Sequence, residues 1–405
     1  MNKFVKNRNP YTLRFSYIPP QFIERTAITD EIMGNFTMEL PTYGCVFITG
    51  VRGAGKTVMM NDIRNKIDSY KDWVTVDLNP ESNLFESLAH MLYQIPEIRP
   101  LFLKAKLDLS MPGIGVSIEK AENYASGDED AVCKMLKILK KSGKKLLVTI
   151  DEITYSEDVA RFSHALSSYA GLGLDVYVLM TGLKENIDNI KNKKSLTFLY
   201  RAKIYTLQNL NRVAMSFNYR DTLGLDMDEA RCLADKSKGY SFAFQAIGYH
   251  FWNLKSEQRN KEKGIDHNLL DEKLDGTLFD MAYEKIWDEL SHKDRMILVT
   301  MQKLRNRYGK ELIRVEEIRK EMDMSSDTFT TYRKRLIDSG IVNGEKYGYL
   351  ELCLPRFGEY ISQTQEFRDS EEKSSLEVQL IIDFMNLPED KQKRLLAYME
   401  KLKSC

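Results

Sequence analysis

The chain has 405 residues, 43% of them hydrophobic, which is enough for two or three domains with packed cores. Its net charge is zero, with 59 basic and 59 acidic residues, so overall charge favours neither a nucleic acid nor a membrane surface as the partner. No uncharged run is long enough to span a bilayer, and the five cysteines lack C-x-x-C spacing, so we expect no membrane partner, reduced thiols, a cytoplasmic location and no metal site made by the protein alone.

The first 40 residues predict an extended arm followed by one helix. Prolines at positions 10, 19 and 20 exclude a continuous helix before Gln21, and the helix is expected near Thr26–Phe36. On the residues alone, this segment is explained by a proline-rich arm that simply covers the core as well as by an arm that takes part in a binding site.

The stretch Tyr43–Thr57 carries the most specific motif of the chain. Its apolar residues Cys45–Ile48 predict a buried strand, and Gly50–Thr57 match the Walker A pattern G-x-x-x-x-G-K-T without departure. Three glycines let the backbone curl so that its N–H groups point at an anion, and the helix expected from about Lys56 turns its positive end toward the same anion. A glycine-rich turn that binds nothing is the alternative.

We expect this loop to bind a nucleoside triphosphate together with Mg²⁺. Lys56 would reach the β- and γ-phosphates, and the Thr57 hydroxyl would be a ligand of the metal. The predicted phosphate-binding residues are Gly50, Val51, Arg52, Gly53, Ala54, Gly55, Lys56, Thr57 and Val58.

Residues 57–141 alternate between predicted helix and strand. A helix is expected over Thr57–Tyr70, a strand over Trp73–Leu78, a helix from Leu84 and another over residues 129–141. Residues 96–120 are expected to be irregular, with a hairpin around Met111–Gly113.

The run Leu146–Glu152 is the second decisive motif. Five mostly apolar strand residues end in Asp151 and Glu152, about 95 residues after the first motif, which is typical of a Walker B strand followed by a glutamate. Asp151 would hold Mg²⁺ through water opposite Thr57, and Glu152 would polarise the attacking water as a general base. An ordinary strand with an acidic edge is the alternative.

The remaining core elements complete a repeated strand–helix pattern. A helix is expected near Val159–Tyr169, a strand over Leu174–Met180 that ends in Thr181, and a fifth strand over Lys203–Leu207. Five such alternations predict a parallel sheet with right-handed crossovers and helices on both faces, with the ligand at the carboxyl ends of the strands.

Residues 289–362 predict a winged helix-turn-helix. A helix capped by Ser291, a second over Ile313–Met322 and a third after Met324 precede two strands around Asn343-Gly344. The segment from His292 to Gly348 has 13 basic and 9 acidic residues, a net charge of +4, which suits either DNA or docking on a protein. The candidate DNA-binding residues, all on the third helix, are Thr328, Thr331, Arg333, Lys334 and Arg335.

The last part of the sequence is a tail that is too short to form a core of its own. Residues 366–375 are expected to be a charged linker, and two helices follow, with apolar residues at helical spacing from Leu376 and with Pro388 at the start of the second helix. We expect this tail to mediate self-association or to bind a protein partner.

With these motifs in place, the chain resembles the AAA/STAND-type P-loop ATPases of archaea and bacteria that are related to the origin-recognition initiators. The resemblance covers about residues 8–362 and rests on F-S-Y-I-P-P in the arm, D-E-I after the Walker B strand, Y-R-A before the fifth strand and L-P-R-F-G-E-Y-I after the wing. It implies ATP and Mg²⁺ as cofactors, slow ATP hydrolysis and a conformational switch. Adenine rather than guanine is implied in the same way, since no N-K-x-D motif is present.

The same resemblance implies roles for individual residues. Ile18, Pro19 and Arg25 would form the pocket for the base, Thr181 would be the sensor that contacts the γ-phosphate or the attacking water, and Arg201 would be an arginine finger, often supplied by a neighbouring subunit. A strand-ending threonine and a surface arginine without these roles are the alternatives.

The expected fold is therefore an α/β P-loop NTPase of ASCE type, a five-stranded parallel sheet between helices, followed by a helical lid and a winged helix-turn-helix. The expected domains are an arm with a base-side helix (1–40), the ATPase core (41–209), the lid (210–288), the winged helix (289–362) and a linker with a helical tail (363–405). Related lids begin G-x-P, whereas Ser241 replaces the proline here and no arginine follows early, so a sensor-2 arginine is expected to be absent.

The function that these features predict is a Mg²⁺-dependent ATPase that acts as a nucleotide-controlled switch coupled to the winged helix, with double-stranded DNA or a protein as the partner. One alternative is a DNA-binding module in which ATP only stabilises the fold. Another is a signalling hub that oligomerises through its tail and binds no DNA. A nucleoside kinase is disfavoured, because the Walker B strand ends in Asp151-Glu152 and no acceptor lid is evident.

Overall fold

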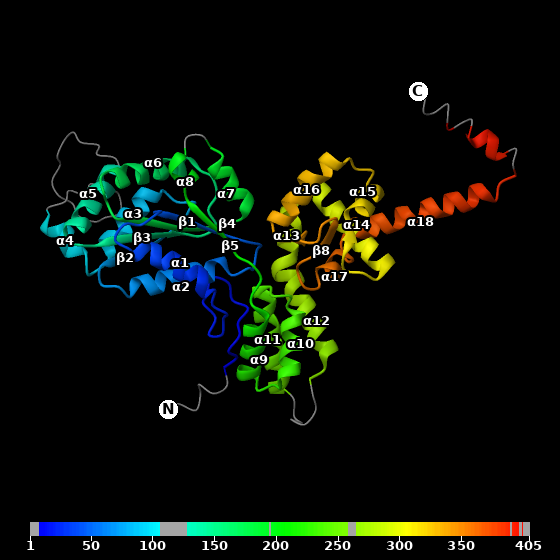
Figure 1. Ribbon diagram of the computed structural model, residues 1–405, viewed down its shortest axis with the longest axis horizontal. Helices are drawn as coiled ribbons and strands as arrows, with labels where there is room; N and C mark the ends of the chain where they lie inside the picture. Colours follow the sequence, from blue (N-terminus) through cyan, green and yellow to red (C-terminus); the bar gives the residue numbers. More distant parts are fainter. Residues whose placement is uncertain are drawn as a thin grey trace. The chain divides into compact units, whose positions relative to one another are not determined.

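The computed structural model describes residues 8–105, 128–193, 196–257, 265–388, 391–396 and 399 (Figure 1). They form two compact units. The first runs to Ala282 and includes Ile337–Ile341, and the second consists of Tyr283–Leu336 and the chain from Val342 onward. The hairpin expected around Met111–Gly113 lies outside the described residues. None of the helices in these ranges has both the length and the apolar character needed to cross a bilayer.

A five-stranded parallel sheet forms the centre of the first unit. Its strands are β1 (Cys45–Thr49), β2 (Trp73–Leu78), β3 (Lys145–Ile150), β4 (Val176–Gly182) and β5 (Lys203–Thr206). The order is β2-β3-β4-β1-β5, so β4 lies between the strand that precedes the glycine-rich loop and the strand that ends in the two acids. The predicted α/β fold of ASCE type is confirmed.

Helices cover both faces of this sheet, as the strand–helix alternation predicted (Figure 1). On one face, α1 (Thr26–Thr37) and α2 (Lys56–Asp68) pack against alternate strand residues such as Val46 and Ile48. On the other face, the neighbouring residue Phe47 belongs to a second cluster. The helices of that face are α3 (Leu84–Gln94), α5 (Asp128–Lys141), α6 (Glu157–Gly171), α7 (Lys184–Lys191) and α8 (Thr197–Tyr200).

A further short helix, α4 (Arg99–Lys104), falls in the stretch that was expected to be irregular. That expectation is wrong for these residues, because Phe102 is fully buried in the second cluster and its packing fixes the segment as a helix. Pro100 stands in the first turn of α4, where a missing N–H costs nothing.

Four helices in the described part of residues 210–282 form the lid of the first unit. They are α9 (Arg212–Leu223), α10 (Met227–Lys236), α11 (Ser241–Glu257) and α12 (His267–Leu278). The side chains of Asn211, Asp226 and Asp266 accept N–H bonds at the starts of α9, α10 and α12. The arm packs on this lid, because the Tyr11 ring fills the space beside Gly248, where an added Cβ would lie 2.5 Å from the ring.

The second unit has the element order of a winged helix-turn-helix. A π-helix (Phe279–Tyr283) and α13 (Glu284–Glu289) lead into α14 (His292–Tyr308), β6 (Ile313–Arg314), α15 (Val315–Glu321), α16 (Ser326–Asp338), β7 (Val342–Asn343) and β8 (Tyr349–Leu352). The predicted cap at Ser291 is confirmed and forms a capping box with Asp294. The three strands pair in the antiparallel order β6-β8-β7. The helix expected from Ile313 begins later, because Ile313 pairs with Leu350.

The last described elements are α17 (Phe357–Ile361) and α18 (Gln365–Met385), and residues 391–396 are also helical. α18 contains residues 366–375, so the expectation of a charged linker is wrong for their secondary structure. The Thr364 hydroxyl caps the helix by accepting the N–H of Phe367 at 3.4 Å, and Lys303 of α14 donates to the Ser370 hydroxyl at 2.8 Å. A capped first turn and a contact with α14 therefore stabilise a helix in this charged sequence.

Candidate nucleotide-binding site

The glycine-rich loop connects β1 to α2 in the first unit, as its sequence predicted. Gly53 and Gly55 have φ values of +77° and +90°, a region that residues with a side chain rarely adopt. Gly55 is the N-cap of α2, so the positive end of this helix lies at the loop. The Lys56 amine donates to the carbonyls of Gly50 at 3.0 Å and Val51 at 3.2 Å, which keeps this cation over the loop.

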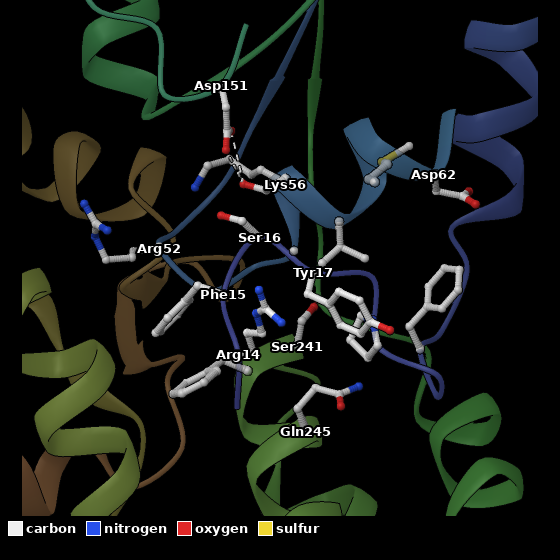
Figure 2. Close-up of a pocket in the computed structure, with 18 of the residues that line it drawn as sticks. Arg14, Phe15, Ser16, Tyr17, Arg52, Lys56, Asp62, Asp151, Ser241 and Gln245 are labelled. Carbon is white, nitrogen blue, oxygen red and sulfur yellow. Dashed lines mark hydrogen bonds between the residues drawn. The ribbon is translucent and has the colours of Figure 1, made fainter. Parts of the chain in front are cut away.

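The two motifs meet through three side chains. The Thr57 hydroxyl donates to the two carboxylate oxygens of Asp151, at 2.8 Å and 3.1 Å, and the Thr181 hydroxyl also donates to Asp151. The sheet brings them together, because β4 pairs with both β1 and β3 and all three strands end at the same edge. Figure 2 shows Asp151 beside Lys56 at one end of the cavity.

Glu152 begins a turn that the neighbouring strand holds in place. Its φ is +52°, its N–H donates to the Thr181 hydroxyl at 3.1 Å, and the N–H of Ile153 donates to the Thr181 carbonyl at 2.8 Å. The Glu152 carboxylate is 68% exposed and lies 3.7 Å from the Arg52 guanidinium. Thr181 is fully buried, so its hydroxyl fixes Asp151 and the backbone of Glu152.

A cavity of about 720 Å³ adjoins the phosphate loop, a size within the range of small-molecule sites. The arm and the lid form the walls away from the loop (Figure 2). Phe15 of the arm stacks on Phe242 of the lid with ring centroids 5.4 Å apart, and the Arg14 guanidinium lies 5.7 Å from the centroid of the Tyr17 ring. Phe15 and Tyr17 are about half exposed, so their rings are available to a flat ligand.

The structure treats the three predicted base-pocket residues differently. Pro19 and Arg25 line the cavity, whereas Ile18 is half-buried and is not among the described lining residues. The Arg25 guanidinium donates to the carbonyls of Ala54 and Gln208, both at 3.0 Å. Burial lowers the pKa of Arg25 to about 10, so it stays charged at neutral pH. Arg25 therefore joins the arm to the loop, a contact that its sequence position does not reveal.

Other aromatic and polar lining residues were not predicted from the sequence. They are Phe15, Tyr17, Phe22, Phe242 and Gln245. For the arm, the signal available in the sequence was the group of aromatic residues Phe15, Tyr17 and Phe22 around two prolines.

Arg201 is exposed at the end of α8, immediately before the edge strand β5. It is not among the residues that line the cavity of its own chain. A role at a nucleotide would therefore require a second subunit.

Both arginines that were predicted to bind DNA make contacts inside the second unit. Arg335 donates to the Ser291 hydroxyl at 2.8 Å and pairs with Asp294, which is 1% exposed. Arg333 donates to the Gly344 carbonyl at 3.3 Å.

The other three candidates on α16 are exposed. Thr328 accepts a hydrogen bond from the Ser325 hydroxyl at 2.9 Å, Thr331 donates to the Asp327 carbonyl at 3.5 Å, and Lys334 is exposed on the same helix. Lys334 is therefore the cation of this set that is best placed for a phosphate group.

The donor set at the loop fits a magnesium triphosphate. The described residues contain no group of three or more carboxylate, imidazole or thiol side chains that could hold a metal ion. Mg²⁺ in proteins is commonly bound by one or two carboxylates together with phosphate oxygens. Asp151 and Thr57 supply the protein part of such a set, and the Lys56 amine matches the charge of the phosphates.

Comparisons with known proteins agree with this fold. The family described as "Domain of unknown function (DUF8462)" matches residues 280–361, and no curated protein matches. The ORC2 protein of Aeropyrum pernix, solved in ADPNP–ADP complexes, is 13% identical with a TM-score of 0.60, over 88% of this chain and 97% of that one. A Walker-type ATPase of Pyrococcus abyssi is 14% identical with a TM-score of 0.56, over 84% and 96%. The chain thus has the fold of origin-recognition-type P-loop ATPases.

Proposed function

We propose that this chain is a cytoplasmic, Mg²⁺-dependent ATPase that acts as a nucleotide-controlled switch. The observation that carries the proposal is the 2.8 Å hydrogen bond between Thr57 of the glycine-rich loop and Asp151 at the end of β3. A hydroxyl and a carboxylate from two motifs 94 positions apart are within bonding distance, beside the amine of Lys56. This combination matches the chemistry of a magnesium triphosphate and has no evident structural need in the core.

Each residue of the site has a role in this proposal. The loop N–H groups and Lys56 bind the phosphates, and Thr57 and Asp151 hold Mg²⁺, which neutralises developing charge on the phosphates when bound. Glu152 polarises the attacking water, and Arg52 at 3.7 Å orients its carboxylate. Thr181 keeps Asp151 and Glu152 in position through two hydrogen bonds.

The aromatic walls of the cavity support a purine base as the remaining part of the ligand. Phe15 and Tyr17 present exposed rings beside Pro19, and rings of this kind favour stacking with a flat heterocycle. We therefore propose ATP as the nucleotide.

The partner of the switch is proposed to be double-stranded DNA, bound through α16. The helix keeps Thr328, Thr331 and Lys334 exposed, which suits phosphate and base-edge contacts. The second candidate is a hub that self-associates without DNA, and the apolar residues Leu376, Leu380 and Met385 of α18 favour it, because all three are more than 60% exposed.

One experiment on a single purified sample tests both the proposed nucleotide binding and the proposed DNA binding. Fluorescent ATP analogue binding is measured with Mg²⁺ and with EDTA, and DNA binding is then measured with ATP, with ADP and without nucleotide at several salt concentrations. We expect Mg²⁺-dependent nucleotide binding and a DNA affinity that falls steeply with salt. Absence of nucleotide binding would refute the ATPase. Absence of DNA binding together with ATP-dependent growth in light scattering would favour the hub.

A further inference from the structure

The lid contacts the backbone of the phosphate loop through three consecutive residues. The Tyr240 hydroxyl donates to the Arg52 carbonyl at 2.7 Å, and the Ser241 hydroxyl donates to the Ala54 carbonyl at 2.8 Å. The N–H of Phe242 donates to the Gly53 carbonyl at 3.1 Å. We call these three hydrogen bonds the lid–loop contact. Three successive loop carbonyls are thus bonded by three successive lid residues at the start of α11.

The fit at the centre of this contact leaves no room for a side chain on the loop. A Cβ added at Gly53 would lie 2.1 Å from the Tyr240 oxygen, and Tyr240 is only 3% exposed. Burial raises the pKa of Tyr240, so its hydroxyl remains a protonated donor. Gly53 is therefore needed for the approach of the lid as well as for the left-handed turn of the loop.

The arm reinforces one of the three hydrogen bonds. Arg25 donates to the Ala54 carbonyl at 3.0 Å and to the Ser241 hydroxyl at 3.3 Å. The Ala54 carbonyl therefore has two donors. Of the lid–loop hydrogen bonds, the one from Tyr240 to Arg52 involves the loop residue whose guanidinium lies 3.7 Å from Glu152.

We propose that Tyr240 is a positioning residue that transmits the nucleotide state of the phosphate loop to the lid. A peptide group is planar, so the N–H that turns toward a phosphate and the C=O that accepts from the lid move together. Binding of a phosphate by these N–H groups therefore biases the lid–loop contact. The sequence of α11 contains no arginine that could reach the loop from this helix, and the backbone contact gives α11 another route for the coupling. The proposal rests on ATP binding at the loop.

The test replaces one hydroxyl at a time in the full chain. Tyr240→Phe removes the donor to Arg52 and keeps the ring. Tyr219→Phe is the matched control, because the Tyr219 hydroxyl is also buried in the lid and donates to a carbonyl at 2.7 Å, but that carbonyl belongs to Phe244 and not to the loop. Hydrogen exchange of residues 240–248 is measured for each protein with and without Mg²⁺-ATP, beside a nucleotide titration.

We expect Mg²⁺-ATP to slow exchange in the wild-type protein and in Tyr219→Phe. In Tyr240→Phe this nucleotide-dependent slowing should fall by about 2- to 10-fold, the effect of one lost hydrogen bond, although ATP still binds. Ser241→Ala should show a smaller loss, because Arg25 also donates to the Ala54 carbonyl.

Equal slowing in Tyr240→Phe and the wild-type protein would overturn the coupling role and leave ATP binding intact. An equal loss in both tyrosine variants would overturn it too, because any buried lid hydroxyl would then have the same effect. If the wild-type protein binds no nucleotide in the titration, the proposed function fails as well, so the two failures are distinguishable.

Discussion

At the carboxyl edge of the central sheet, polar side chains from separate segments converge on one another, whereas on α16 of the second unit the arginines turn toward their own domain. Thr57, Asp151 and Thr181 share hydrogen bonds although they come from three different segments. On α16, Arg335 pairs with the buried Asp294, and Arg333 bonds to a backbone carbonyl. The first arrangement places several polar groups where one ligand could contact them all. In the second, internal contacts of the protein occupy the arginines that were predicted to bind DNA.

The physical difference between the two regions lies in what each motif requires. A phosphate loop requires a particular backbone, which the glycines at φ +77° and +90° provide, so the residue pattern and the geometry are tied together. A basic helix requires only side-chain charge, and an arginine serves equally well in an internal ion pair. Charge on a helix is therefore weaker evidence for a binding surface than a glycine-lined loop.

The largest effect is expected from Lys56→Ala in the first region. The Lys56 amine lies over the loop carbonyls, so its removal takes away the charge that binds phosphate and should weaken ATP binding by about 100-fold or more. Calorimetric titration with Mg²⁺-ATP measures the change. Lys134→Ala, which removes a lysine paired on the surface of α5, is the control and should bind normally. Normal Mg²⁺-ATP binding by Lys56→Ala would contradict the proposal that this loop binds phosphate.

A loss confined to turnover, without loss of nucleotide binding, is expected from Glu152→Gln. The exposed carboxylate beside Arg52 is the proposed base, so its neutral isostere should retain ATP but slow phosphate release by about 100- to 10,000-fold. Single-turnover phosphate release, with nucleotide affinity measured in parallel, separates the two effects. Glu157→Gln, at the nearby start of α6, should leave both unchanged. Unchanged phosphate release in Glu152→Gln would remove this residue from the chemistry.

On α16, we expect substitutions of the neighbouring residues Arg335 and Lys334 to have different effects. Arg335→Ala should lower the free energy of unfolding by about 2 kcal/mol, because Asp294 would keep a buried charge without this partner, a cost reduced by the partial exposure of Arg335. Lys334→Ala should leave the melting temperature unchanged but reduce the salt dependence of DNA binding by about one charge. Thermal melts and DNA titrations on both variants test the pair, and a reversed pattern would make Arg335 the DNA contact.

The smallest effect concerns pH and the lid. Burial, with a further contribution from Lys273, lowers the pKa of His250, so the folded protein binds this proton more weakly than the unfolded chain. The stabilisation is fully present above the ordinary histidine value of about 6.5 and is lost as the pH falls below it. His250→Asn should therefore flatten the decline in melting temperature between pH 7 and 5. An identical decline in the variant would assign it to other groups.

The fold was largely predictable because long elements carry their own signals. The apolar run at Cys45–Ile48 and the glycines after it predict strand, loop and helix, and the alternation of such units predicts the parallel sheet. Short elements were missed, since α4 and β6 are helix and strand only through burial of Phe102 and pairing of Ile313. The charged segment of α18 shows that composition without packing partners can suggest a linker where a helix forms.

Residues of the site that belong to a sequence motif could be predicted, whereas contacts between segments that are distant in the sequence could not. Lys56, Thr57 and Asp151 lie together because the order of parallel strands requires it. The hydrogen bond from Tyr240 to the Arg52 carbonyl joins residues 188 positions apart, and no local sequence pattern at either position predicts it. Arg25 lies at the expected place, but its bonds to the loop and lid depend on how the arm folds back.

The backbone of Glu152 has a consequence for how this position can evolve. Its φ of +52° costs a residue with a side chain about 1–2 kcal/mol, and glycine would relieve that cost. Selection for thermal robustness alone would therefore enrich chains that have glycine here and lack the carboxylate. Selection for the proposed ATP hydrolysis would instead retain the strained glutamate. A library screened for heat resistance would thus tend to lose the proposed base at this one position.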